Sequence, residues 1–435
     1  MRTNTKPETI HTHEGAVASH VAPIEALRRS VLACMLWEST FYEDGMTVAE
    51  RIKSLVPKCS PQDVADLAIQ AREQMRLRHA PLLLVRELAR YGSRFPVADT
   101  LARVIQRADE LPEFLAMYWN GEGKKPIAKQ VKKGLAKAFR KFDEYALSKY
   151  NRDASIKLRD VLFMVHAKPK DDDQAALWKR LVDGKLLPAG TWEELLSAGH
   201  DKREAFEGLL REKKLGYLAL LRNLRNMEQA GVERSLVFDA LRAGAEKSKA
   251  LPFRFVAAAR AVPAWERQID EAMQIACSGL PKLGGSTIVL VDVSGSMGDK
   301  LSAKSDLTRQ DAASALAVLV RGICDDVRVM TFSNVLAEVP ARMGMALIDA
   351  IRGSQPNGGT YLGKAVETVT KRFQAGRLIV ITDEQSADQV VAPRGRGYMI
   401  NVSTHQNGVG YGSWTHINGW SESVIAYIAA LEVRD

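Results

Sequence analysis

Hydrophobic residues recur at three- and four-residue intervals along most of the first 280 residues, the pattern of amphipathic helices that bury one face. Many of these segments open on proline or on a serine, threonine or aspartate, residue types that favour the first turn of a helix. Strand-like alternation is nearly absent. The spacing predicts helices at 24–38, 61–77, 81–91, 97–107, 112–119, 126–147, 158–166, 174–182, 192–198, 202–213, 216–227, 233–243 and 252–261, and a linking helix at 265–278.

Many short helices with brief connections favour a HEAT-like α-solenoid, although no fixed repeat length is visible. After a proline- and glycine-rich boundary at 281–285, short apolar runs alternate with helical patterns. This alternation predicts a doubly wound α/β domain with a mostly parallel sheet. We therefore expect an N-terminal segment at 1–23, a helical-repeat domain at 24–280 and an α/β domain at 281–435. In the last of these, strands are expected at 287–291, 327–332, 377–382 and 397–402, and helices at 309–322, 343–351, 362–373 and 420–431.

A metal-binding loop is expected where the first apolar strand of the α/β domain ends. That strand runs into Asp292, Ser294 and Ser296, which place three oxygen ligands on one turn. Downstream, a glycine-rich loop delivers the hydroxyl of Thr360, and another buried strand ends at Asp383. Ligands bind outside the carboxyl ends of parallel strands, so these loops should converge, and Mg²⁺ prefers such oxygen ligands. The alternative is that the serines and Asp383 only cap helices.

Together these motifs resemble the von Willebrand factor A domain and its metal-ion-dependent adhesion site. The resemblance implies that Asp292, Ser294, Ser296, Thr360 and Asp383 bind a divalent metal, Mg²⁺. It also implies a sixth position that is open to an acidic group of a protein partner. No convincing nucleophile or positioned base accompanies the ligands, so we expect a binding protein and not an enzyme.

The formal net charge of +9 arises entirely from residues 1–280, because residues 281–435 carry equal numbers of basic and acidic side chains. Most of the excess lies between residues 124 and 141, where lysines at four-residue intervals form a stripe opposite an apolar face. Like charges at this spacing destabilise a helix, so the stripe indicates a polyanion partner, with nucleic acid favoured over an anionic membrane surface. A solvated lysine-rich face is the alternative. The basic residues are Lys124, Lys125, Lys129, Lys132, Lys133, Lys137, Arg140 and Lys141.

Three helical segments, at 158–169, 215–227 and 251–255, resemble the TROVE module, the helical ring of the Ro autoantigen and its bacterial relatives. The resemblance implies a monomeric ring closed by the metal-site domain. It also implies binding of noncoding Y RNA and of the single-stranded 3′ ends of misfolded RNA, in RNA quality control with an exoribonuclease partner. Lys149, Arg152 and His166 are similar to RNA-contacting residues of the family. His166 is otherwise a helix cap or a packed core group.

Aromatic side chains flank the basic segment, and bases of single-stranded RNA stack on such side chains. Tyr118, Trp119, Tyr145 and Tyr150 are the candidates, with burial in the core as the alternative.

Other features of the sequence exclude whole classes of protein. No apolar run approaches the roughly 18 residues of a membrane span, and residues 1–25 lack the apolar core of a signal peptide, so we expect a cytoplasmic protein. The cysteines at 34, 59, 277 and 324 lie far apart, which favours free thiols over a zinc site or disulfides. Two hypotheses follow: an RNA-binding ring, or a protein-interaction adaptor whose metal site captures an acidic residue.

Overall fold

The computed structural model shows a chain of two compact units, one formed by Met1–Ala22, Leu32–Val48 and Asp201–Asp435 and the other by Pro23–Val31 and Ala49–His200. The first unit contains both the later helices and the α/β sheet, so the sequence boundary near residue 281 falls inside it. The residues that the structure describes are 11, 15–17, 22–32, 45–75, 77–91, 96–120, 123, 125–192, 195, 199, 201–248, 250, 252–280, 282–300, 307–402, 412–418, 425, 428 and 432.

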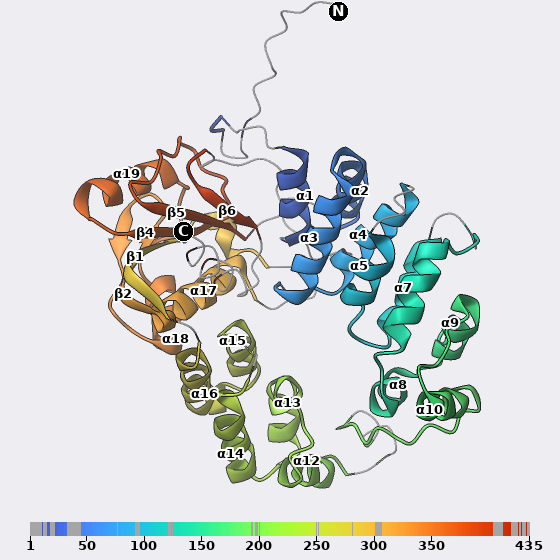
Figure 1. Cartoon of the computed structure of the whole chain (residues 1–435). Coiled ribbons are helices and arrows are strands. Elements are labelled where there is room, and N and C mark those ends of the chain that lie inside the picture. Colours follow the sequence, from blue (N-terminus) through green and yellow to red (C-terminus); the bar gives the residue numbers. More distant parts are fainter. Residues whose placement is uncertain are drawn as a thin grey trace, which may run out of the picture. The chain divides into compact units, whose positions relative to one another are not determined.

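The second unit is built from short helices, as the sequence predicted, and neighbouring helices pack on one another (Figure 1). Helix α7 packs on α5 at Gly134, where an added Cβ would lie only 2.9 Å from the Ala98 carbonyl oxygen. The helix α2 was not predicted. The helices are α1 (Pro23–Leu32), α2 (Gly45–Leu55), η1 (Val56–Lys58), α3 (Pro61–Glu73), α4 (His79–Arg90), α5 (Val97–Val104), α6 (Glu110–Trp119), α7 (Lys129–Phe139), α8 (Glu144–Tyr150), α9 (Leu158–Val165) and α10 (Asp172–Val182).

The prediction of a single helix at 126–147 is wrong. Helix α7 ends at Phe139, and the carboxylate of Asp143 accepts a hydrogen bond of 2.8 Å from the Ala146 amide, so that Asp143 caps a new helix, α8. Lys141 lies in the turn between them. Its ammonium donates to the carbonyls of Ala102 and Ile105 at the end of α5, which removes Lys141 from the basic stripe.

The later helices belong to the first unit and lead directly into the α/β part. Helices α15 and α16 pack on α17 (Arg309–Ile323), and the buried carboxylate of Asp311 accepts hydrogen bonds from Arg260 on α15. The expected helix at 192–198 lies mostly outside the described residues. The helices before the sheet are α12 (Lys202–Arg211), α13 (Tyr217–Gln229), α14 (Arg234–Ala245), α15 (Pro252–Ala261), η2 (Pro263–Trp265) and α16 (Glu266–Ser278).

The sheet of the first unit has the order β3-β2-β1-β4-β5-β6 and is parallel except for β3, which pairs antiparallel with β2. The four predicted strands are confirmed, whereas β3 and β6 were not predicted, and the helix expected at 420–431 lies mostly outside the described residues. Helices α17 and α18 (Gly344–Arg352) lie on one face and α19 (Leu362–Arg372) on the other (Figure 1). The strands are β1 (Leu283–Asp292), β2 (Cys324–Phe332), β3 (Leu336–Glu338), β4 (Arg377–Thr382), β5 (Arg396–Asn401) and β6 (Thr415–Asn418).

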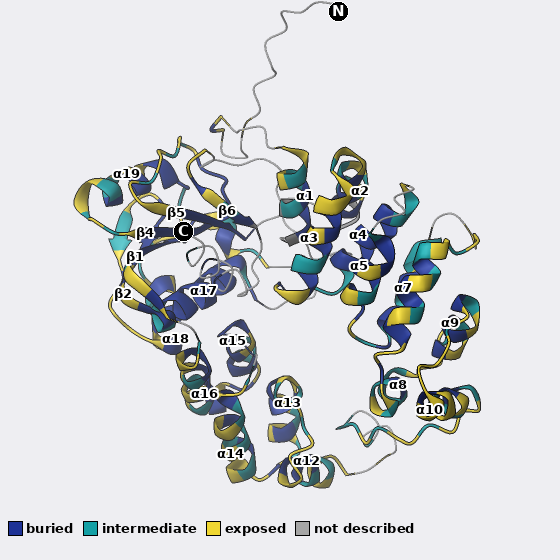
Figure 2. Cartoon of the chain, in the orientation of Figure 1, coloured by how far each residue is buried: buried dark blue, intermediate teal, exposed yellow. Residues whose placement is uncertain are grey.

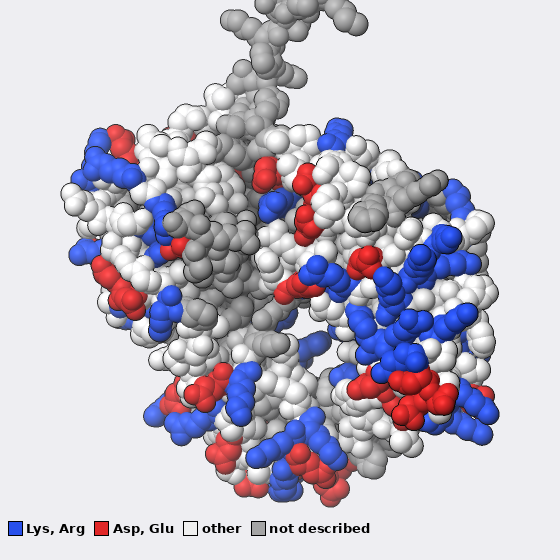
Figure 3. All heavy atoms as spheres, in the orientation of Figure 1, with Lys and Arg blue, Asp and Glu red and all other residues white. Residues whose placement is uncertain are grey.

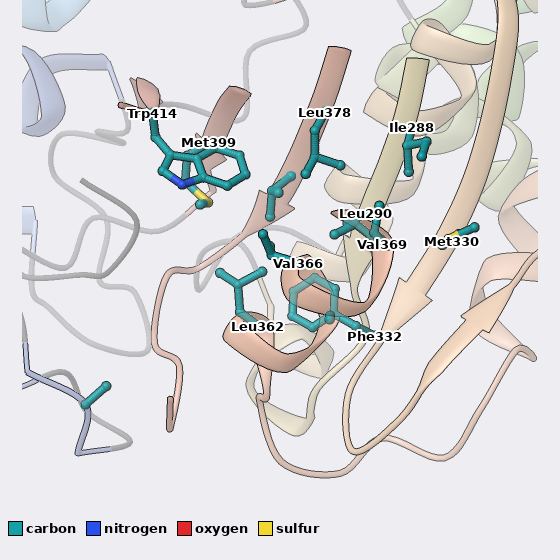
Figure 4. Close-up of a cluster of buried hydrophobic side chains, with 13 residues drawn as sticks. Ile288, Leu290, Met330, Phe332, Leu362, Val366, Val369, Leu378, Met399 and Trp414 are labelled. Atoms are coloured by element: carbon teal, nitrogen blue, oxygen red, sulfur yellow. The ribbon is translucent and has the colours of Figure 1, made fainter. Parts of the chain in front are cut away.

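The sheet's apolar core explains where its polar residues must lie. Side chains of the central strands meet Leu362, Val366 and Val369 of α19 in one buried cluster (Figure 4), and the opposite sides of β1 and β4 are buried as well. Strands covered on both faces are apolar throughout, so polar side chains appear only where they end. Because Val291 pairs with Ile381, β1 and β4 end side by side, and this register brings Asp292 and Asp383 to one edge.

The N-terminal segment does not consist only of solvated tail. Ala16 is buried in the cluster that also contains Leu362 and Trp414, and the Gln389 side-chain amide donates to the Val17 carbonyl at 2.9 Å. His11 is exposed. No helix among the described residues is long and apolar enough to cross a membrane.

Candidate metal centre and basic surface

The loop after β1 is folded around the carboxylate of Asp292. The Ser294 amide donates to Asp292 Oδ1 at 2.9 Å, and the two serine hydroxyl oxygens, of Ser294 and Ser296, lie 3.4 Å apart. The Gly295 amide donates to the carbonyl of Gly358 at 3.0 Å, which ties this loop to the glycine-rich loop that carries Thr360. The turn therefore presents its oxygen atoms in a small space beside a second loop.

The end of β4 closes the same network from the other side. The Ser296 hydroxyl donates to Asp383 Oδ2 at 2.7 Å, and the Thr382 hydroxyl donates to Asp292 Oδ2 at 2.6 Å. Asp292 and Asp383 are both fully buried, while Ser296 is half-buried and opens toward solvent. Two buried carboxylates and the hydroxyls of Ser294, Ser296 and Thr382 thus share one hydrogen-bonded cluster.

The backbone of Thr360 is hydrogen-bonded to the loop that follows β4, at the same end of the sheet. Its carbonyl accepts hydrogen bonds from the Ala387 amide at 2.9 Å and from the Ser386 hydroxyl at 3.2 Å. The following helix presses against this loop, because a Cβ at Gly363 would lie 1.9 Å from the Gln389 carbonyl oxygen. The Thr360 side chain is buried, and within the described part of the chain its hydroxyl has no hydrogen-bond partner.

The helix-capping alternative does not describe these residues. Thr308 caps α17 by accepting a hydrogen bond from the Asp311 amide at 3.1 Å. At the start of α19, the Asp388 carboxylate accepts hydrogen bonds from the amides of Gly363 at 2.7 Å and Lys364 at 2.8 Å. Ser294 stands before the short turn η3 (Gly295–Gly298) but makes no side-chain cap there. The oxygen atoms of the cluster therefore take part in hydrogen bonds within the cluster and do not cap a helix.

Electrostatics favour a proton or a cation in this cluster. Burial, and then the negative charge of Asp383, raise the pKa of Asp292 to about 7. Two carboxylates with several hydroxyls form the all-oxygen donor set that Mg²⁺ prefers, so the residues fit such an ion. Within the described residues no group of three or more His, Cys, Asp or Glu forms a metal cluster, so any ion here relies on the hydroxyls.

A contact between the side chains of Glu384 and His416 supports this loop, and no pattern in the sequence predicts it. Glu384 is fully buried, has a positive φ of 60°, and lies with Oε1 2.9 Å from Nδ1 of His416. A left-handed backbone at a non-glycine residue is strained and persists only where the surroundings hold it. His416 belongs to β6, a strand too short and polar to be recognised from its pattern.

The basic stripe survives in part on α7, where exposed positions occupy one side of the helix (Figure 2). Lys129, Lys132 and Lys133 have no ion-pair or hydrogen-bond partner for their side chains among the described residues. Lys137 forms an ion pair of 2.6 Å with Asp99 on α5. Figure 3 shows lysine and arginine side chains gathered over the part of this unit where α7 and α9 lie. Three unneutralised lysines therefore form the centre of the stripe.

The remaining predicted RNA-contact residues are spread around this centre. Lys124 lies outside the described residues, and Lys125 and Arg152 are exposed. The guanidinium of Arg140 donates to the Lys168 carbonyl at 2.8 Å, which joins the end of α7 to the segment that follows α9. His166 ends α9 in a left-handed conformation, with φ of 52°, and its side chain is exposed, so it is not a packed core group.

The aromatic side chains are not simply core. Tyr145 is 53% exposed, and the ammonium of Lys149 lies 5.5 Å from the centre of its ring and 5.8 Å from that of Tyr150. Tyr118, Trp119 and Tyr150 are half-buried. The Trp119 ring nitrogen donates to the Lys125 carbonyl at 2.8 Å, which holds the segment before α7 in place. Only Tyr145 among the four offers most of its ring to solvent.

Comparison with known proteins finds two known domains between residues 173 and 385. Residues 173–318 match the TROVE domain, and residues 287–385 match the von Willebrand factor type A domain. The chain carries a TROVE domain and a von Willebrand factor type A domain. Among solved structures, the RO (RSR) protein of Deinococcus radiodurans is similar, with 18% sequence identity and a TM-score of 0.63, over 94% of this chain and 100% of that chain. No curated protein sequence matches the chain.

The predicted metal ligands lie within a matched stretch, whereas the predicted RNA-contact residues lie outside both. All five predicted metal ligands lie within the stretch that matches the von Willebrand factor type A domain. The basic residues of α7 and the residues up to His166 all precede the stretch that matches the TROVE domain. The similarity to the RO protein extends over them as a likeness of fold: a helical region followed by an α/β domain.

Proposed function

We propose that this protein binds RNA, specifically noncoding Y-like RNA and the single-stranded 3′ ends of misfolded RNA, and that it scaffolds RNA quality control or processing, with an exoribonuclease as a protein partner. The TROVE domain and the likeness to the RO protein support the class of ligand. We further propose a monomeric ring closed by the von Willebrand factor type A domain, located in the cytoplasm. The protein acts in this proposal by binding and not by catalysis.

The observation that carries the proposal is the row of unneutralised lysines on α7. Lys129 and Lys133 are exposed one helical turn apart, with Lys132 beside them, and like charges at this spacing oppose helix formation by a few tenths of a kcal/mol per pair. A phosphate backbone relieves that repulsion and releases its own counterions on binding. Lys137, which a carboxylate already neutralises, contributes less to such a surface.

The proposed role of the metal centre is structural or adhesive. Asp292 and Asp383 would hold Mg²⁺ together with the hydroxyls of Ser294, Ser296 and Thr360. The ion would supply positive charge to the buried carboxylates and an open coordination position for an acidic group. Its charge would also replace the proton that burial favours on Asp292.

Crosslinking the full-length protein to RNA in cells and sequencing the bound RNA tests the function. We expect enrichment of noncoding RNAs and of RNAs with unpaired 3′ ends over an equally abundant cytosolic protein. Recovery of RNA at the level of an uncrosslinked control would contradict the proposal.

A second candidate function is a Mg²⁺-dependent protein adaptor, which the rim of the metal centre favours. Val335 is 61% exposed and Tyr361 is 43% exposed, and their loops are joined by a hydrogen bond of 3.2 Å from the Tyr361 amide to the Ser333 carbonyl. Exposed apolar side chains beside an open metal position suit a protein that presents a carboxylate. The basic helix would then be incidental.

Replacing Asp292 by alanine separates the two functions. If the adaptor function is correct, we expect D292A to lose the partners that the wild type captures in Mg²⁺ and to keep its RNA affinity. Capture of the same partners by the wild type in EDTA would argue against a role for the metal.

A further inference from the structure

An aromatic side chain stands outside the core on α9. Phe163 is 60% exposed, although the helix buries its neighbours Val161, Leu162 and Val165. Single exposed apolar residues are common on protein surfaces and need no explanation by themselves. Phe163 differs from them in its setting, because the side chains that share its helix face are cationic or titratable.

That face is defined by helical spacing. Arg159 precedes Phe163 by one turn, and its side chain is 51% exposed; His166 follows by three residues and is exposed. Lys168 comes next, and its carbonyl accepts the hydrogen bond from Arg140 at the end of α7. Within the described residues, the side chains of His166 and Lys168 have no hydrogen-bond or ion-pair partner. The ring of Phe163 therefore lies between groups that attract phosphate.

The acidic side chains close to this face form helix caps or ion pairs with other groups. Asp160 accepts the Lys157 amide at 2.8 Å and so caps α9, with only a long contact of 3.9 Å to Arg159. Asp153 forms an ion pair of 2.6 Å with Lys157, and Asp171 caps α10 by accepting the Gln174 amide at 2.8 Å. A phosphate near Phe163 would meet cations whose charges these carboxylates do not cancel directly.

We propose that Phe163 is a stacking platform for one unpaired nucleobase, with Arg159, His166 and Lys168 holding the adjoining phosphates. The proposal rests on the RNA-binding function and names the feature of the RNA that this surface recognises: an unpaired base and not a duplex. A base in a helix is already stacked on its neighbours, whereas an unpaired base presents a free face to an aromatic ring. The ring contributes affinity without charge.

A thermodynamic cycle between protein and RNA tests the contact. The full-length wild type and F163A are titrated by fluorescence anisotropy against a labelled RNA hairpin with a single-stranded 3′ tail, and against the same hairpin with abasic nucleotides in the tail. We expect F163A to weaken binding of the intact tail roughly 5- to 100-fold and to have no further effect on the abasic tail. F163W should keep the affinity and F163L should lose it.

Two further measurements separate stacking from other causes. The slope of log affinity against log salt should be the same for F163A and the wild type, because no cation is removed. Y91A removes another aromatic ring of the same unit, 55% exposed, and should bind both RNAs as the wild type does.

An equal loss on intact and abasic tails, or full affinity in F163L, would overturn the stacking role and leave a positioning or protein-docking role for the ring. Absence of tail binding by the wild type would instead overturn the RNA-binding function itself, and this inference with it.

Discussion

Replacing Lys129, Lys132 and Lys133 together by glutamate is expected to reduce affinity for RNA with a single-stranded 3′ tail by at least about 100-fold. These lysines lack neutralising partners among the described residues, so each is free to displace counterions from the phosphate backbone. The triple change removes three positive charges and adds three negative ones on one side of α7. Filter binding at several salt concentrations measures the effect.

The neutral triple variant gives a sharper test of the same surface. With glutamine at the three positions, the slope of log affinity against log salt should fall in magnitude by about 2, since each phosphate contact on a single strand contributes roughly 0.7. The helix itself should be preserved or slightly more stable, because like-charge pairs are removed. Circular dichroism and thermal unfolding of the variant check this point.

A matched control changes the same amount of charge elsewhere. Lys202, Lys213 and Lys247 are exposed residues of the first unit with no side-chain partner among the described residues. Their triple glutamate variant should retain most of the RNA affinity. An equal loss of RNA affinity in both triple variants would show that net charge, and not this surface, governs binding. Unchanged affinity in the α7 variant would show that this surface does not bind the RNA.

The sequence predicted the α/β architecture well because local and long-range information agree there. The apolar runs 288–291 of β1 and 378–381 of β4 are buried, and each is followed within two residues by a carboxylate, Asp292 or Asp383. Strand ends in a parallel sheet share one edge, so the ligand candidates could be grouped without coordinates. The support from Glu384 and His416 could not be foreseen, because it depends on a strand with no apolar pattern.

The basic stripe was predicted less well, for a different reason. Phe142 and Leu147 continue the apolar period of α7, so the pattern could not reveal that Asp143 starts a new helix. Lys137 is neutralised by Asp99, and Lys141 turns to the end of α5. Both partners lie more than 30 residues away in the chain, and periodicity contains no information about them.

The second large effect concerns Asp292. In EDTA, the free energy of unfolding is expected to fall as pH rises from about 4 to about 7, by on the order of a few kcal/mol over that range. The pKa of Asp292 is raised from 3.8 to about 7 in the folded protein, mainly by burial and then by the charge of Asp383. Below pH 3.8 the group is protonated in both states and contributes nothing.

Between the two pKa values the unfolded chain loses this proton while the folded chain keeps it, which favours unfolding increasingly. Above pH 7 both states are ionised and the cost stays constant. A divalent cation on the carboxylates takes the place of the proton, and it competes best where protons are scarce. Adding Mg²⁺ should therefore stabilise the protein strongly at pH 8 and hardly at pH 4.

Urea unfolding followed by intrinsic fluorescence, in EDTA and in Mg²⁺, measures both effects, and two asparagine variants identify their source. D292N should be more stable than the wild type at pH 8 in EDTA, because it buries no charge, and should not respond to Mg²⁺.

Asp270 on α16 is the matched control. Burial also raises its pKa, but its Oδ1 accepts a hydrogen bond from the Met345 amide at 2.9 Å, and it is not one of the five predicted ligands. D270N should flatten the pH profile in part and keep the full Mg²⁺ response. A Mg²⁺ response that persists in D292N would place the ion on other residues, since the proposed site cannot hold it without this carboxylate.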